Sequence, residues 1–384
     1  MSTTSARNPG IDLLRGISIL LVLLNHIGIR IRLMKGILAA VLPKQVLIDI
    51  TYNGGEGVII FFVISGFLIA TNSMQRWGRL GRIDVRAFYA RRASRILPCL
   101  VGLVAILSVL HLAHVPDYVI HSPQSLPKAV TSAFGLYLNW YEGHTGYLPA
   151  SWDVLWSLSI EEVFYIGFPL VCLLVRKDRI LAPALAVLAL SQPFALRSIV
   201  GNDIWRQKAY LPGMAAIAMG VLATIAAVHI QRDRRWLRIS LIAAGACGVF
   251  TDLAFEDNLF HWMGFWILFV LMISAAALIL GFHLQARAVP GWSLMGTRWL
   301  QSCGRLSYEI YLTHSFVVLT VVRIFKLSHA GDRWGVLWFA PAILLAWALG
   351  WLVAKFYSVP CEQAMRRRLM PRKHEPSAVA IAAN

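Results

Sequence analysis

Charge is scarce in this sequence. Only 14% of the 384 residues are Asp, Glu, Lys or Arg, whereas 58% are hydrophobic. Soluble domains carry about 25% charged and about 45–50% apolar residues, so much of this protein's surface must face something other than water. The few charges are also unbalanced, with 36 Lys and Arg against 19 Asp and Glu. Because the basic residues cluster in short loops between apolar runs, they indicate membrane topology and argue against nucleic-acid binding.

Features of secreted disulfide-rich proteins and of metal sites are missing as well. The five cysteines form no CxxC pair and no even framework, so we assign them neither disulfide bonds nor a metal. The first apolar run contains Asp12 and Arg15, and no small-residue cleavage pattern follows it. It is therefore expected to be a retained first span, not a cleaved signal peptide.

Ten apolar stretches are long enough to cross a bilayer, which takes about 17–25 residues. They are 11–29, 57–75, 96–114, 156–175, 180–196, 210–229, 237–253, 260–282, 305–323 and 335–357. The sequence therefore predicts an all-α, polytopic membrane bundle of about ten transmembrane helices. Residues 10–362 would form one membrane domain, and residues 363–384 a basic, then Ala-rich, disordered tail.

The positions of the basic residues predict the orientation of this bundle. They concentrate in segments 76–95, 176–179, 231–238, 287–305 and the tail, all on one side if there are ten spans. Basic loops stay in the cytoplasm, so both termini are expected there, in a protein of the cell membrane. An eleventh span at Ala129–Trp140 would move the 231–238 loop outside, so that segment is expected to be a helix at the surface. Segment 30–56 is expected to be an amphipathic interfacial helix.

Two ionisable residues in the first span share one helical face. Arg15 and His26 are eleven residues apart, which leaves them about 20° apart around the helix and roughly 16 Å apart along it. Ionisable groups inside a bilayer are candidates for function by default. An interfacial histidine and an arginine that snorkels inward would give the same pattern.

Three further groups of polar residues mark other spans. Arg92 and Arg95 share a face before the third span and would suit a phosphate-rich ligand, although positive-inside charge alone also explains them. In the fourth span Glu161 needs a partner. His26 could be that partner, because a carboxylate fixes the tautomer of a histidine and strengthens it as a base. Ser65 in the second span and His314 in the ninth are equally explained by packing and by interface anchoring.

Together these segments resemble the acyltransferase family 3 of integral membrane O-acyltransferases, from Gly10 to about Glu362. The motifs that carry the resemblance are Arg15-x10-His26, residues 61–67 (FFVISGF), 91–98 (RRASRILP), 156–165 (WSLSIEEVFY) and 307–314 (SYEIYLTH). Many relatives carry an Arg and an Asp where this chain has Gly213 and Ala215, and many read Glu-x-Pro where Glu362 is followed here by Gln363 and Ala364. The first of these departures bears on donor or acceptor selectivity more than on the reaction.

The resemblance implies that an acyl group passes from cytoplasmic acyl-coenzyme A to a hydroxyl of a carbohydrate or glycolipid acceptor. Acyl-coenzyme A would be a substrate, and no permanently bound cofactor or metal is expected. The implied roles are coenzyme A binding by Arg15, Arg92 and Arg95, general-base catalysis by His26 with support from Glu161, and substrate binding by Ser65, Trp156, Ser157, Tyr308 and His314. A secondary transporter with a buried Arg/His/Glu site is the competing class, but the internal repeat expected of one is not found.

Overall fold

The structure is a computed structural model that describes residues 7–230, 232–329 and 331–370. Over these residues every regular element is helical, and ten helical segments are long and apolar enough to cross a membrane. They are Pro9–Gly28, Gly54–Trp77, Val85–Leu112, Ser151–Val175, Asp178–Ser198, Asp203–His229, Arg235–Met263, Trp266–Ala288, Ser307–Leu327 and Asp332–Leu369. The predicted all-α bundle of ten spans is confirmed.

Most spans are single helices, and some are built from two or more elements. The single ones are α1 (Pro9–Gly28), α3 (Gly54–Trp77), α4 (Val85–Leu112), α13 (Arg235–Met263), α14 (Trp266–Ala288) and α16 (Ser307–Leu327). The composite ones are α7 (Ala150–Asp153) with α8 (Leu155–Val175), α9 (Asp178–Leu190) with α10 (Gln192–Ser198), α11 (Asp203–Lys208) with α12 (Tyr210–His229), and the last span. That last span combines the 3₁₀ turn η4 (Asp332–Trp338), α17 (Phe339–Val353), the π-helix η5 (Ala354–Ser358) and α18 (Val359–Leu369).

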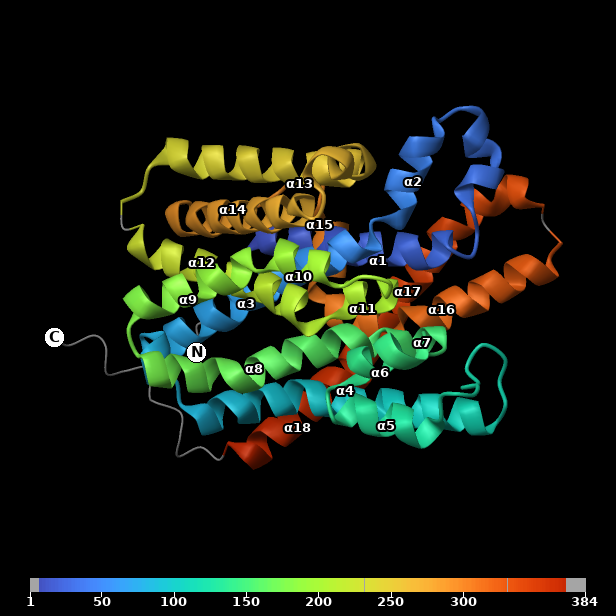
Figure 1. Ribbon diagram of the computed structural model, residues 1–384, viewed down its shortest axis with the longest axis horizontal. Coiled ribbons are helices and arrows are strands. Elements are labelled where there is room, and N and C mark those ends of the chain that lie inside the picture. The colour runs from blue at the N-terminus through green and yellow to red at the C-terminus, as the bar shows by residue number, and fades with distance from the viewer. Residues whose placement is uncertain (1–6, 231, 330, 371–384) are drawn as a thin grey trace.

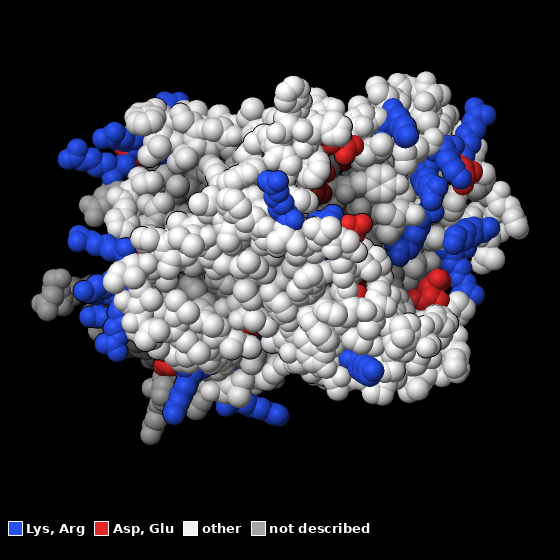
Figure 2. Space-filling model, viewed as in Figure 1, with Lys and Arg blue, Asp and Glu red and all other residues white. Residues whose placement is uncertain are grey.

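The spans run along the long axis of the molecule, and successive spans alternate in direction (Figure 1). We call the end of the bundle where α1 begins the N-terminal face, and the other end the distal face. Lys and Arg gather at these two ends, and the surface between them is mostly uncharged on the side shown in Figure 2. A broad uncharged belt of this kind is what a lipid bilayer requires.

Glycines bring the backbones of two spans together. A Cβ at Gly66 of α3 would collide with the carbonyl oxygen of Ile217 in α12, and one at Gly220 of α12 with that of Val63 in α3. Small residues at helix crossings are what permits such close approach in membrane bundles. The contact fixes α3 against α12 along the middle of the bundle.

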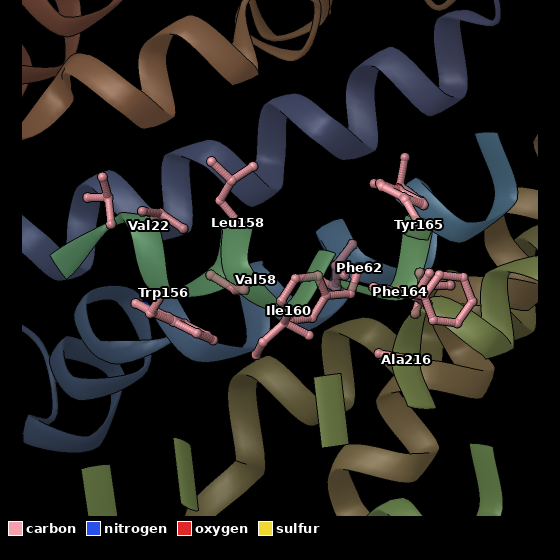
Figure 3. Packing of buried hydrophobic residues seen from close by; sticks show 14 of the residues in the cluster. Val22, Val58, Phe62, Trp156, Leu158, Ile160, Phe164, Tyr165 and Ala216 are labelled. Atoms are coloured by element: carbon pink, nitrogen blue, oxygen red, sulfur yellow. The ribbon is translucent and has the colours of Figure 1, made fainter. Parts of the chain in front are cut away.

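The rotation of α8 follows from its packing against this pair. Trp156, Ile160 and Phe164 form an apolar ladder on α8 that faces Phe62 of α3 and Ala216 of α12, while Tyr165 points the other way (Figure 3). The rings of Trp156 and Phe62 meet edge to face with centroids 6.3 Å apart. Because the apolar ladder takes one face, the polar residues of α8 are turned to the opposite face.

Three peripheral segments differ from expectation. In place of one surface helix at 129–140 the chain forms α5 (Leu126–Phe134) and α6 (Leu138–Thr145), broken where Leu136 adopts a positive φ. Ala129 and Leu138 are fully buried, so these helices pack into the bundle. Segment 30–56 contains the 3₁₀ turns η1 (Leu33–Lys35) and η2 (Ile37–Ala40), and then α2 (Lys44–Tyr52), whose Leu47 is buried.

The start of the predicted tail also differs, because α18 continues to Leu369. Residues 363–369 are therefore helical, and the rest of the predicted tail, 371–384, lies outside the described residues. A further short 3₁₀ turn, η3 (Leu80–Arg82), joins α3 to α4, and α15 (Arg298–Arg305) packs on α1 before α16 begins.

Candidate functional site

A cavity of about 470 Å³ lies between α1, α3, α4, α8, α16 and α18. Along α3 its lining extends from Val58 near the distal face to Trp77 near the N-terminal face. At 1.5 Å per residue this is roughly 28 Å of helix, close to the thickness of a bilayer's hydrocarbon core. The cavity is therefore long enough to hold an extended ligand.

The walls of this cavity are strongly basic. Six arginines line it, namely Arg15, Arg76, Arg91, Arg92, Arg95 and Arg366, against the two carboxylates Glu161 and Glu362. The sequence predicted three of the six as ligands of a phosphate-rich molecule. It gave no reason to add Arg366, because that residue lies in the segment expected to be a disordered tail.

Arg92 is already paired. Its Nη2 lies 2.6 Å from Glu162 Oε1 and 3.7 Å from Glu161 Oε1, and its guanidinium lies 4.0 Å from the centroid of the Tyr165 ring. These contacts neutralise much of its charge and hold α4 against α8. Arg92 lines the cavity, but its contacts with Glu162 and Tyr165 anchor the wall, and its predicted binding of coenzyme A stays a prediction.

Arg15 and Arg95 have fewer polar contacts than Arg92. Arg15 donates from Nε and Nη2 to the hydroxyl of Ser307, at 3.2 and 2.8 Å. Arg95 lies with its guanidinium 5.6 Å from the Tyr308 ring centroid, and over the described chain it makes no hydrogen bond or ion pair. Arg95 therefore presents the most available donors for an anionic ligand.

Glu161 lies with the arginines and not beside His26. Its carboxylate accepts hydrogen bonds from Ser65 and, at 2.8 Å, from Tyr165. At Gly54, α3 touches Asn25, the neighbour of His26, and Ser65 is eleven residues further along α3, roughly 16 Å away. The expected His26–Glu161 pair is thus not formed. Glu161 instead belongs to the middle of the cavity.

His26 lies beyond the distal end of the cavity, against a second histidine. The rings of His26 and His314 have centroids 4.9 Å apart, and the ring of Tyr311 lies 6.0 Å from that of His314. Tyr311 and Ser157 line the cavity and are joined by a hydrogen bond of 2.7 Å between their hydroxyls. Tyr311 therefore borders the cavity and also lies next to His314.

The five predicted substrate-binding residues divide into two groups. Ser65, Ser157 and Tyr308 line the cavity. Trp156 and His314 lie outside its lining, on the distal side. The predicted set is therefore split between the cavity and the region around His26.

One charged cluster was not predicted from the sequence at all. Lys208, only 1% exposed, contacts Glu142 Oε2 at 2.8 Å and also pairs with Asp153. The same ammonium lies 4.5 Å from the Tyr147 ring centroid and 5.8 Å from that of Trp156. Because the three charged residues come from three separate segments, no spacing along the sequence points to them.

The positions that depart from the resembled family are closely packed. A Cβ at Gly213 would lie 2.8 Å from Ile160 Cγ2, and Ala215 is fully buried. An arginine or aspartate does not fit there in this packing. Glu362, by contrast, lines the cavity.

Comparison with known proteins identifies a family. Residues 8–355 match the acyltransferase 3 family model, described as an acyltransferase domain. A Staphylococcus aureus (strain COL) protein named "Putative O-acetyltransferase" is 30% identical over 168 residues, which is 42% of this chain and 24% of that protein. The O-acetyltransferase OatA of Staphylococcus aureus (strain NCTC 8325 / PS 47) is 28% identical over 169 residues, with the same coverage.

The chain therefore aligns with about a quarter of the length of these curated relatives. No solved structure matches it. The family model, however, covers nearly all of the chain, including all five motifs and every residue of the cavity except Glu362 and Arg366. The chain thus belongs to the acyltransferase 3 family, and its described part has ten helical segments that could span a membrane.

Proposed function

We propose that this enzyme transfers an acyl group, in the simplest case acetyl, from cytoplasmic acyl-coenzyme A to a hydroxyl of a carbohydrate or glycoconjugate. The observation that carries this proposal is the long cavity lined by six arginines, which ends beside two histidines. Its basic walls suit the phosphates of coenzyme A, and its length suits an extended pantetheine arm. The relatives named as O-acetyltransferases support a hydroxyl as the acceptor.

In this proposal the two ends of the cavity have different tasks. Arg15 and Arg95 hold the phosphates, and Arg76 and Arg366 extend the basic surface toward the N-terminal face. We propose that this face and both chain termini are cytoplasmic, in a protein of the cell membrane, because basic loops are preferentially retained in the cytoplasm. The thioester then lies at the distal end, where the hydrogen-bonded Tyr311 and Ser157 line the cavity on the side of the two histidines.

The reaction needs one proton carrier. His26 takes the proton from the acceptor hydroxyl while the oxygen attacks the thioester carbonyl carbon. The tetrahedral intermediate collapses, the carbon–sulfur bond breaks, and the proton passes from His26 to the sulfur of coenzyme A. The products are the acylated acceptor and free coenzyme A, so atoms and charge balance without a further reactant.

The acceptor approaches from the distal face in this scheme. Tyr147, which lies over the Lys208 ammonium, is 55% exposed there, and an exposed aromatic ring offers an apolar face to a sugar ring. A glycan or glycolipid at the outer surface of the membrane is the acceptor class that this arrangement favours.

The test compares His26→Ala with His283→Ala, a histidine of α14 that packs on the Phe67 ring at 5.2 Å, away from the cavity. Surface glycans of cells that produce each variant are analysed by mass spectrometry for added acyl groups. A general base contributes roughly 10²–10⁴-fold, so His26→Ala should abolish the modification and His283→Ala should preserve it. Equal acylation with both variants would rule out His26 as the base.

A second measurement tests the donor. The purified protein in detergent is titrated with coenzyme A by calorimetry. Binding that is lost in the Arg15→Ala, Arg95→Ala double variant, but kept in His26→Ala, would support donor binding by the two arginines and a separate catalytic role for His26. Unchanged binding in the double variant would place the nucleotide outside this cavity.

A further inference from the structure

His314 has a defined tautomer and an unused nitrogen. Its Nδ1 lies 2.7 Å from the carbonyl oxygen of Tyr311 and 3.2 Å from that of Ile310. Carbonyl oxygens only accept hydrogen bonds, so Nδ1 carries the proton and Nε2 keeps its lone pair. The side chain is fully buried, and Nε2 has no partner among the described residues. A buried acceptor without a donor is costly, so a donor is expected at this point.

The ring that can supply this donor is that of His26. The two imidazoles come from α1 and α16, with centroids 4.9 Å apart and planes inclined by 60°. Rings in contact at this separation can bring their nitrogens within hydrogen-bonding reach when either ring reorients. Over the described chain the ring of His26 makes no hydrogen bond, and unlike that of His314 it keeps part of its surface exposed. His26 can therefore meet a substrate, whereas His314 is enclosed.

We infer that His314 is the positioning residue for the catalytic base, a deduction that rests on the function proposed above. Its Nε2 accepts a hydrogen bond from one nitrogen of His26 when the substrates are bound. A neutral imidazole has one donor and one acceptor nitrogen, so the second nitrogen of His26 is then left as the acceptor for the hydroxyl proton. Catalytic hydrogen bonds that are loose in a free enzyme commonly tighten in the reacting complex.

This role is the one that a carboxylate usually plays beside a catalytic histidine. Glu161 cannot fill it, because its hydrogen bond to Ser65 holds it roughly 16 Å away along α3. His314 is also held more rigidly than a lone side chain, since its Nδ1–H is tied to the backbone of α16. The buried histidine thus sets the tautomer and the direction of the exposed one.

The kinetic test uses His314→Leu, His314→Gln and the control His283→Leu in proteoliposomes. Acetyl-coenzyme A is the probe, and the release of the coenzyme A thiol with water as acceptor is the readout. His314→Leu should lower kcat about 10–100-fold, as loss of a supporting hydrogen bond to a site ligand typically does, with KM for acetyl-coenzyme A unchanged. Gln carries a carboxamide oxygen that can accept in place of Nε2, so it should restore most of kcat, and His283→Leu should match the parent.

Nuclear magnetic resonance of ¹⁵N-histidine-labelled protein with coenzyme A bound gives a readout independent of turnover. His314 should be protonated at Nδ1 only, and His26 should show a single tautomer. A mixture of tautomers at His26, or a proton on Nε2 of His314, would overturn the inference even if the Leu variant fails to fold. Full kcat in His314→Leu, together with loss of activity in His26→Ala, would also overturn it and leave the proposed function standing.

Discussion

Arg92 and Arg95 lie one turn apart on α4, yet their replacement by alanine should have different effects. Arg95 stacks near Tyr308 and forms no hydrogen bond or ion pair over the described chain. Arg92 is bound to Glu162 at 2.6 Å and lies over the ring of Tyr165. Arg95 should therefore bind the donor substrate, and Arg92 should stabilise the cavity wall.

For Arg95→Ala we expect weaker coenzyme A binding with little change in stability. A hydrogen bond to a charged group contributes about 1.5–3 kcal/mol, which corresponds to about a 10–150-fold rise in Kd. Arg95→Lys should recover only part of this loss, because an ammonium cannot form the two parallel bonds of a guanidinium. The melting temperature should stay close to that of the parent.

For Arg92→Ala we expect a loss of stability with a smaller effect on coenzyme A binding. The side chain of Glu162 is only 13% exposed, and removal of one partner from a buried ion pair typically costs about 3–5 kcal/mol. The residual exposure of both partners argues for about 3 kcal/mol, the low end. Replacement of both residues, as Arg92→Met with Glu162→Leu, should recover part of the stability, because the unpaired charge of Glu162 is removed while Glu161 keeps its hydrogen bonds from Ser65 and Tyr165.

The assay combines calorimetric titration of coenzyme A with thermal unfolding of the same detergent-purified samples. The reasoning would be refuted if Arg92→Ala weakened binding more than Arg95→Ala while both variants kept the parental melting temperature. In that case the Arg92–Glu162 pair would open in the complex, and Arg92 would be the principal phosphate ligand.

Three shorter predictions concern stability and topology. Lys208→Met should destabilise the protein by about 3–5 kcal/mol in thermal unfolding, since it leaves the buried carboxylate of Glu142 without its cation. Gly66→Leu should separate α3 from α12 and abolish folded protein on size-exclusion chromatography, whereas Gly55→Leu, with open space around it, should be tolerated. A reporter fused after Asp117, in the loop at the distal face, should read as external, and a cytoplasmic signal there would reverse the proposed orientation.

The span count could be predicted from the sequence because lipid imposes simple rules. Each span must be long, apolar and helical, and the ten apolar stretches correspond to the ten candidate spans among the described residues. The shared helical face of Arg15 and His26 could also be predicted, since both lie on the single uninterrupted helix α1. In the structure both side chains are turned toward α16, where Arg15 meets Ser307 and His26 meets His314.

Contacts between separate segments could not be predicted in the same way. The tail helix contributes Arg366 to the cavity only because η5 and α18 continue the last span beyond its apolar part. Likewise, α5 and α6 are too short and too polar to be read as bundle elements, yet Leu138 is fully buried. In both cases the structure is determined by contacts with segments distant in the sequence, and these contacts cannot be predicted from a local pattern of residues.

The depth of Glu161 shows how one such contact alters the prediction of a site. A span beginning at residue 156 puts Glu161 near the distal boundary and within reach of His26. In the structure the span begins at Ser151, so Glu161 lies ten residues, or roughly 15 Å, inside it. The extra turn contains Asp153, whose charge argues against a membrane segment until Lys208 is seen to neutralise it. With the span extended to Ser151, Glu161 lies among the arginines of the cavity, and His314 is the residue that faces His26.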